Sequence, residues 1–102
     1  MTDNEERVTA KAFYKACSNL NIDNNIQFEI ASISREHGDP RLLFLKVLQF
    51  VYSIGNDDEF VKHWLRTENH AFADSPLGMC KSSEGLVTVL EYLGQMTTRI
   101  QR

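Results

Sequence analysis

Hydrophobic residues recur at intervals of three and four through most of the chain, the spacing of one face of an α-helix. The pattern predicts a first helix of about ten residues that begins after Thr9 and a second that begins after Asp23, because both residue types are good N-caps. Asp39 followed by Pro40 marks the start of a third helix over residues 40–54. No strand-like alternation longer than a few residues occurs. The sequence therefore predicts an all-α fold.

The second half of the chain continues this pattern with three more helix starts. The predicted N-caps are Asp57 or Asn56, then Ser75 ahead of Pro76 for a one-turn helix, and Ser82 or Ser83 for the last helix. We expect a compact bundle of about five to six short helices.

The helix over residues 40–54 is apolar on nearly every side. Its polar residues, Lys46, Gln49 and Ser53, form one narrow stripe. A helix of this kind is buried, and in so small a chain the other helices would not cover it fully. We therefore predict a homodimer, with candidate interface residues Phe44, Leu48, Phe50 and Val51.

Composition and charge narrow the functional classes. The chain has 102 residues, of which 42% are hydrophobic and 25% charged, as in an ordinary globular protein with a single core. The net charge of −3 includes no basic block, which argues against autonomous DNA binding. The longest apolar stretch, residues 42–54, is too short and too polar to span a bilayer. Residues 1–7 are acidic and polar, unlike a secretory signal, so we expect a cytoplasmic protein.

Residues for catalysis or cofactor binding do not gather in any recognised spacing. The three histidines and two cysteines follow no metal-ligand pattern, the glycines are isolated, and no nucleophile lies beside a base. Cys17 and Cys80 lie in apolar-periodic segments, which predicts that they are small buried hydrophobic residues. We therefore expect no catalytic residue, no metal, no cofactor and no enzymatic activity.

The residues from Trp64 onward are the most specific part of the sequence. They read Trp64-Leu65-Arg66-Thr67-Glu68-Asn69-His70-Ala71-Phe72, then Ser75-Pro76-Leu77, then Ser83-Glu84-Gly85, with Val89 and Leu93 in the last helix. This ordered pattern resembles the toxin-binding domain of the Xre/MbcA/ParS antitoxins. Each part also has a physical reason: Trp64 supplies bulk to a small core, Pro76 favours helix initiation, and Gly85 leaves space for close helix approach. Glu68 and His70 replace two loop prolines of the family pattern, so we expect a less rigid loop, and Gly78 replaces the usual Asp.

The resemblance implies a domain organisation. Residues 40–102 would form the toxin-binding domain, with its last three helices as the antitoxin signature. Residues 9–39 would be a degenerate helix-turn-helix, and residues 1–8 a flexible N-terminus. Residues 34–38 are too few for a recognition helix, so we expect DNA binding to be weak or absent.

The resemblance also implies a function. The chain would bind and sterically block a cognate RES-type toxin, an enzyme that consumes NAD or transfers ADP-ribose. The alternatives are a DNA-binding autoregulator, or a stand-alone helical interaction domain without a toxin partner. The candidate toxin-binding residues are Arg66, Asn69, His70, Phe72, Arg99 and Arg102. Arg66 is either a contact residue or a cap on the carbonyl end of its own helix, and Phe72 is either an anchor or a core residue that pins the loop.

Overall fold

The computed structural model describes the backbone of residues 3–100 and the side chains of residues 4–96. This part of the chain forms six helices: α1 (Asp3–Asn19), α2 (Asn24–Ala31), α3 (Pro40–Gly55), α4 (Asp58–Arg66), α5 (Pro76–Met79) and α6 (Ser83–Ile100). Apart from two isolated bridges, no β-pairing is found among these residues. The predicted all-α bundle is confirmed.

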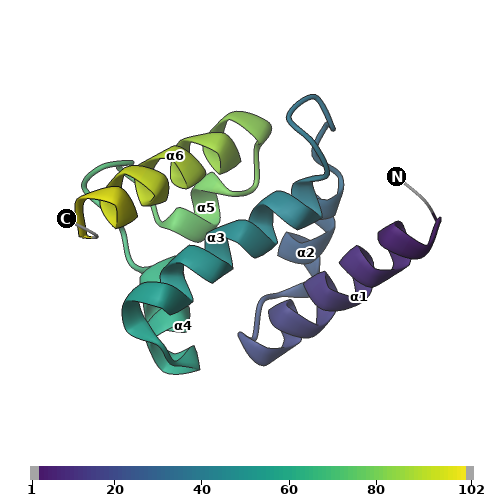
Figure 1. Cartoon of the computed structure of the whole chain (residues 1–102), viewed down its shortest axis with the longest axis horizontal. Coiled ribbons are helices and arrows are strands. Elements are labelled where there is room, and N and C mark those ends of the chain that lie inside the picture. The colour runs from purple at the N-terminus through teal and green to yellow at the C-terminus, as the bar shows by residue number, and fades with distance from the viewer. Residues whose placement is uncertain (1–2, 101–102) are drawn as a thin grey trace.

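Helix α3 lies at the centre of the molecule. It packs against α1 and α2 on one side and against α4 and α6 on the other, while α5 lies between α4 and α6 (Figure 1). Its position explains why it is apolar on nearly every side: four other helices share its surface. One continuous core results, whose buried members are Phe13, Cys17, Leu20, Ile22, Ile30, Phe44, Val47, Leu48, Val51, Val61, Leu65, Leu77, Cys80, Leu86, Val89 and Leu93.

Local hydrogen bonds start most of the helices where the sequence predicts. The side chains of Asp23, Asp39, Asp57 and Ser75 each accept a hydrogen bond from a backbone N–H two or three residues later, and Ser82 Oγ accepts one from Gly85 N. These bonds satisfy amide groups that the first turn of a helix leaves without a partner. The prediction for α1 is wrong, because this helix begins at Asp3 and Thr9 lies inside it. Acidic side chains near the positive end of the helix dipole, among them Glu5 and Glu6, favour the earlier start.

Gly85 confirms the close approach expected at the start of α6. A side chain at this position would overlap the backbone carbonyl of Met79, at the end of α5. The missing Cβ therefore allows α5 and α6 to come together.

Candidate functional site

Helix α4 has one face in the core and another beside the following loop. Val61 and Leu65 are fully buried, whereas Phe60 and Trp64, one position earlier in each turn, are only partly buried. The Phe60 ring packs where Gly55 has no side chain. Tyr52 holds the start of the helix by donating a hydrogen bond to Asp58 Oδ1 at 2.6 Å. Burial and this bond raise the pKa of Tyr52 to about 12, which keeps the phenol protonated.

The loop over residues 67–74 is closed by hydrogen bonds centred on Asn69. Its backbone N–H donates to Asp74 O, and its carbonyl accepts from the N–H groups of Phe72 and Ala73, all at 3.0 Å. Its side-chain Oδ1 accepts from Ala71 N at 2.9 Å. Ala73 adopts a φ of 58° to complete the turn. These bonds order a loop that lacks the two prolines of the antitoxin pattern.

A hollow of about 300 Å³ lies between α4 and this loop. We call it the α4–loop hollow. Its lining residues are Phe60, His63, Trp64, Thr67, Glu68, Asn69 and His70. The lining of the hollow thus combines two aromatic rings, one carboxylate and two imidazoles.

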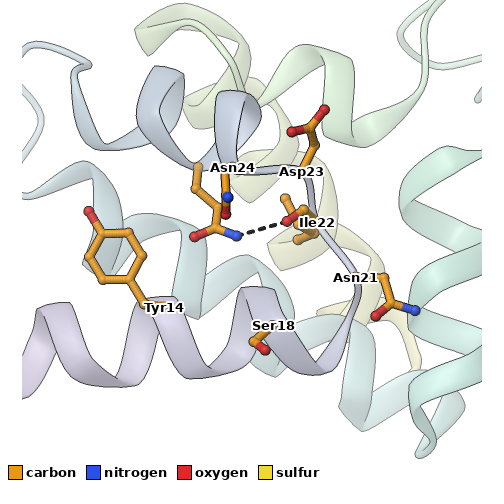
Figure 2. A pocket seen from close by; sticks show the side chains of 7 residues that line it. Tyr14, Ser18, Asn21, Ile22, Asp23 and Asn24 are labelled. Carbon is orange, nitrogen blue, oxygen red and sulfur yellow. Dashed lines mark hydrogen bonds between the residues drawn. The ribbon is translucent and has the colours of Figure 1, made fainter.

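A larger and more open hollow, of about 580 Å³, lies at the junction of α1 and α2. Figure 2 shows its lining, with Tyr14 and Ser18 on α1 facing the turn and first residues of α2. Gln27 donates a hydrogen bond from Nε2 to Ile22 O at 2.8 Å. Within the described residues, no buried side-chain N or O atom lacks a hydrogen-bond partner, so this hollow presents no buried polar group aimed at a ligand.

A comparison with protein families assigns the region that contains α4, the loop and α5. Residues 48–97 match the sequence profile of the family described as the antitoxin Xre/MbcA/ParS C-terminal toxin-binding domain. This segment of the chain belongs to that family. No curated protein matches the chain. The toxin-binding segment therefore begins in the second half of α3 and ends within α6.

Arg66 points away from the loop of the toxin-binding segment and toward α1. Its guanidinium donates to Leu20 O and Asn21 O, both at 2.9 Å, and to Lys62 O at 3.1 Å. It therefore caps the carbonyl end of α1 in addition to that of its own helix, where a cation is also favoured by the helix dipole. Of the two roles left open by the sequence, the cap agrees with these contacts.

The other candidate toxin-binding residues occupy different positions. His70 is exposed on the loop, whereas Asn69 is half-buried and makes the hydrogen bonds that close the loop. Phe72 packs edge-to-face on Tyr92 of α6, with ring centroids 5.1 Å apart. Phe72 thus pins the loop to α6. The side chain of Arg99 and the whole of Arg102 lie outside the described residues.

The four candidate dimer residues divide into buried and half-buried positions. Phe44, Leu48 and Val51 are 0%, 3% and 0% exposed within the single chain, and Phe50 is half-buried. The first three are core residues that α1, α2, α4 and α6 already cover. Only Phe50 is open to a partner without rearrangement of the core.

Membrane, metal and thiol chemistry find no support in this part of the chain. None of the described helices has the length and apolar character needed to cross a bilayer, and no three potential ligands among the described residues are grouped around a metal position. Burial raises the pKa of both Cys17 and Cys80 to about 12, so neither forms a thiolate at neutral pH.

The sequence alone does not predict that Trp64 and Glu68 line the α4–loop hollow. Trp64 packs against the core, as expected, and it also lines the hollow. In the sequence, Glu68 is distinctive only because it replaces a loop proline of the family pattern. The sequence does contain a signal for the aromatic part of the hollow. The adjacent apolar pairs Phe60-Val61 and Trp64-Leu65 recur after four residues, and only one residue of each pair can face the centre of the core, so the other is left nearer the surface.

Proposed function

We propose that this chain is an antitoxin that binds and sterically blocks a cognate RES-type toxin. The observation that carries the proposal is the match of residues 48–97 to an antitoxin toxin-binding domain. The RES class of the toxin follows from the resemblance of the motifs from Trp64 onward. Such inhibition requires no chemistry of the antitoxin, because a helical surface that covers the toxin's NAD-binding cleft excludes its substrate. A protein of this kind would act in the cytoplasm, where NAD is available to the toxin.

We propose the loop over residues 67–74 and the adjoining face of α6 as the contact surface. Asn69 closes this loop and Phe72 anchors it on α6, so its shape is set before binding, which lowers the entropic cost of association. His70 is one of the exposed side chains of this loop that line the α4–loop hollow. Arg66 contributes by holding α4 in place.

Co-expression tests this function. The chain is produced together with a candidate RES-type toxin, and the NAD content of the cells and the co-purified complex are measured. We expect preserved NAD and a stable complex. His70→Lys, which adds length and a positive charge to the loop, should weaken binding at least about tenfold. His37→Lys is the matched control, because His37 is exposed in the loop before α3. Equal affinities of the two variants, or depleted NAD beside the unmodified chain, would contradict the proposal.

We also propose that residues 9–39 are the remnant of a helix-turn-helix and that DNA binding is weak or absent. Only the non-helical residues 32–39 separate α2 from α3. The next helix, α3, packs against four other helices, and its exposed stripe offers a single cation, Lys46, for contact with phosphates. Fluorescence anisotropy with duplexes from the promoter region should detect no sequence-specific complex at physiological salt; a tight specific site would contradict this proposal.

The homodimer remains a proposal with a different contact surface. The exposed large hydrophobic residues of the described chain are Val8, Tyr14, Phe28 and Leu42. All four precede the toxin-binding segment, so a dimer that used them would leave the loop over residues 67–74 free for the toxin.

A further inference from the structure

Two half-buried aromatic rings of the toxin-binding segment lie side by side in the lining of the α4–loop hollow. None of the exposed large hydrophobic residues of the described chain lies in residues 48–97. Phe60 and Trp64, both half-buried, line the hollow from successive turns of α4. A partner that uses these rings must therefore insert a side chain between α4 and the loop.

The rim of this hollow carries a carboxylate without a counter-charge. Glu68 is exposed and takes part in no ion pair of the described chain. The hollow has neither lysine nor arginine in its lining, and its two imidazoles are the side chains of His63 and His70. The nearby cations are engaged elsewhere: Lys62 pairs with Glu59 at 3.2 Å, and Arg66 caps α1. The hollow is thus complementary to a positive charge.

We propose that the α4–loop hollow receives an arginine side chain of the partner toxin. The guanidinium stacks on the rings of Trp64 and Phe60, and its N–H groups donate to the carboxylate of Glu68. A planar cation gains from both contacts at once, because an aromatic face attracts positive charge and the N–H fork of arginine matches a carboxylate. A purely apolar side chain would cover Glu68 without replacing its bonds to water, at a cost in free energy. This proposal rests on the proposed function for the identity of the partner.

The single tryptophan of the chain makes the hollow directly observable. Trp64 is the only tryptophan among the 102 residues, so its fluorescence and its indole N–H resonance report on this hollow alone. The probe is Nα-acetyl-L-arginine amide, titrated into the full chain without toxin. Nα-acetyl-L-citrulline amide is the control, because it has nearly the same shape and no charge, and Nα-acetyl-L-lysine amide separates a guanidinium from an ammonium.

We expect the arginine probe to shift the Trp64 resonance with a millimolar Kd. The citrulline probe should bind roughly fivefold more weakly, as expected for loss of an exposed cation–π contact and ion pair. Binding of the lysine probe should fall between the two. Equal binding of the arginine and citrulline probes, or of the arginine and lysine probes, would overturn the assignment to arginine, as would no shift at any concentration.

Matched variants test whether the carboxylate of Glu68 is responsible for the preference for the arginine probe. Glu68→Gln should remove most of the preference for the arginine probe over the citrulline probe, whereas Glu29→Gln, an exposed position on α2, should preserve it. Trp64→Phe keeps an aromatic ring and should weaken the arginine probe about threefold, read from backbone resonances of residues 67–70. A preference unchanged in Glu68→Gln would overturn the role of the carboxylate.

The toxin complex supplies a second and separable readout. Glu68→Gln should weaken the complex, and Glu29→Gln should not. If the toxin complex forms but Glu68→Gln binds as tightly as the unmodified chain, the arginine proposal fails and the antitoxin proposal stands. If no toxin complex forms while the probes behave as expected, the antitoxin proposal fails and the hollow keeps its assigned chemistry.

Discussion

The N-terminal helices and the toxin-binding segment are built on the same central helix, yet they leave different surfaces. Around α1 and α2, large hydrophobic side chains remain in solvent, with Phe28 at 72% and Val8 at 61% exposure. In residues 48–97 no large hydrophobic residue is exposed to that degree, and the accessible aromatic rings are half-buried. The toxin-binding segment therefore offers a shaped hollow and an ordered loop, whereas the N-terminal helices offer isolated apolar side chains.

The difference in surface does not extend to the interior. Phe13 of α1 packs edge-to-face on Phe44 of α3 with centroids 5.8 Å apart, and Arg66 joins α4 to the end of α1. A second junction joins α1 to the start of α3: Glu6 lies 3.6 Å from Arg35, which lies 3.4 Å from Asp39. The helices that precede residue 40 are thus an integral part of the fold. We infer that they support the toxin-binding segment.

The largest expected effect follows from removing the N-terminal helices. A chain of residues 40–102 would lose α1 and α2 and expose the side of α3 that contains Phe44. We expect it to lack cooperative unfolding, because a chain this short buries too little apolar surface to remain stable after part of its core is removed. Circular dichroism during urea titration checks this. A cooperative transition with sharp amide resonances would instead establish residues 40–102 as an independent domain.

A smaller effect is expected at the junction between α1 and α3. The Asp39 side chain is almost fully buried; although burial opposes its charge, hydrogen bonds and attraction from Arg41 and then attraction from Arg35 lower its pKa. A lowered pKa in the folded state means that the carboxylate stabilises the fold above its ordinary range, about pH 4, and that this contribution is lost as the pH falls through the folded value. Asp39→Asn keeps a capping side chain but loses the ion pairs, and should cost about 2 kcal/mol at pH 7.

Urea titrations at several pH values test the junction. The difference in unfolding free energy between the unmodified chain and Asp39→Asn should shrink below about pH 4. Asp23→Asn is the control, because Asp23 caps α2 without an ion pair in the described residues. A difference that stays constant down to pH 2 would show that the charge of Asp39 contributes nothing.

The sequence could predict contacts between neighbouring residues, but it could not predict the contacts at these two junctions, which join distant parts of the chain. The caps at Asp23, Asp39, Asp57 and Ser75 were predictable, because each bond links a side chain to an amide two or three residues away. The same holds for Gly85, whose place follows from the motif that opens α6. Local rules fail where partners are distant: the bond from Arg66 to Leu20 spans 46 residues.

The candidate site shows the same division. The motif from Trp64 onward located the toxin-binding segment, because it is an ordered pattern of residue types. It could not show that Arg66 turns toward α1, that Phe72 rests on Tyr92, or that Trp64 lines a hollow. Each of these depends on how α4, the loop and α6 pack together. Periodicity also did not reveal that Phe44, Leu48 and Val51 of α3 lie in the core of the single chain.

At the junction where Arg66 joins α4 to the end of α1, we expect a cost of about 1 kcal/mol. Arg66→Met keeps the methylene stem but removes the hydrogen bonds to α1, and its exposure to solvent limits the loss. The control is Arg7→Met, an exposed arginine on α1, which should change the unfolding free energy by less than about 0.5 kcal/mol. Amide hydrogen exchange at Leu20 and Asn21 should also accelerate in Arg66→Met alone. Equal stability and exchange in the two variants would mean that Arg66 does not join the two regions.

The smallest expected effect on stability concerns Phe28, the most exposed large side chain of the described residues. Because its ring gains little from folding, Phe28→Ser should change the unfolding free energy by less than about 0.5 kcal/mol. Its effect on association should be larger if the exposed residues around α1 and α2 form the dimer contact. Sedimentation at high concentration should then give a dimer for the unmodified chain and a mass near 11.7 kDa for the variant. Phe50→Ser is the matched comparison on α3: dissociation by this change alone would return the dimer contact to the central helix, and a monomeric unmodified chain would contradict both surfaces.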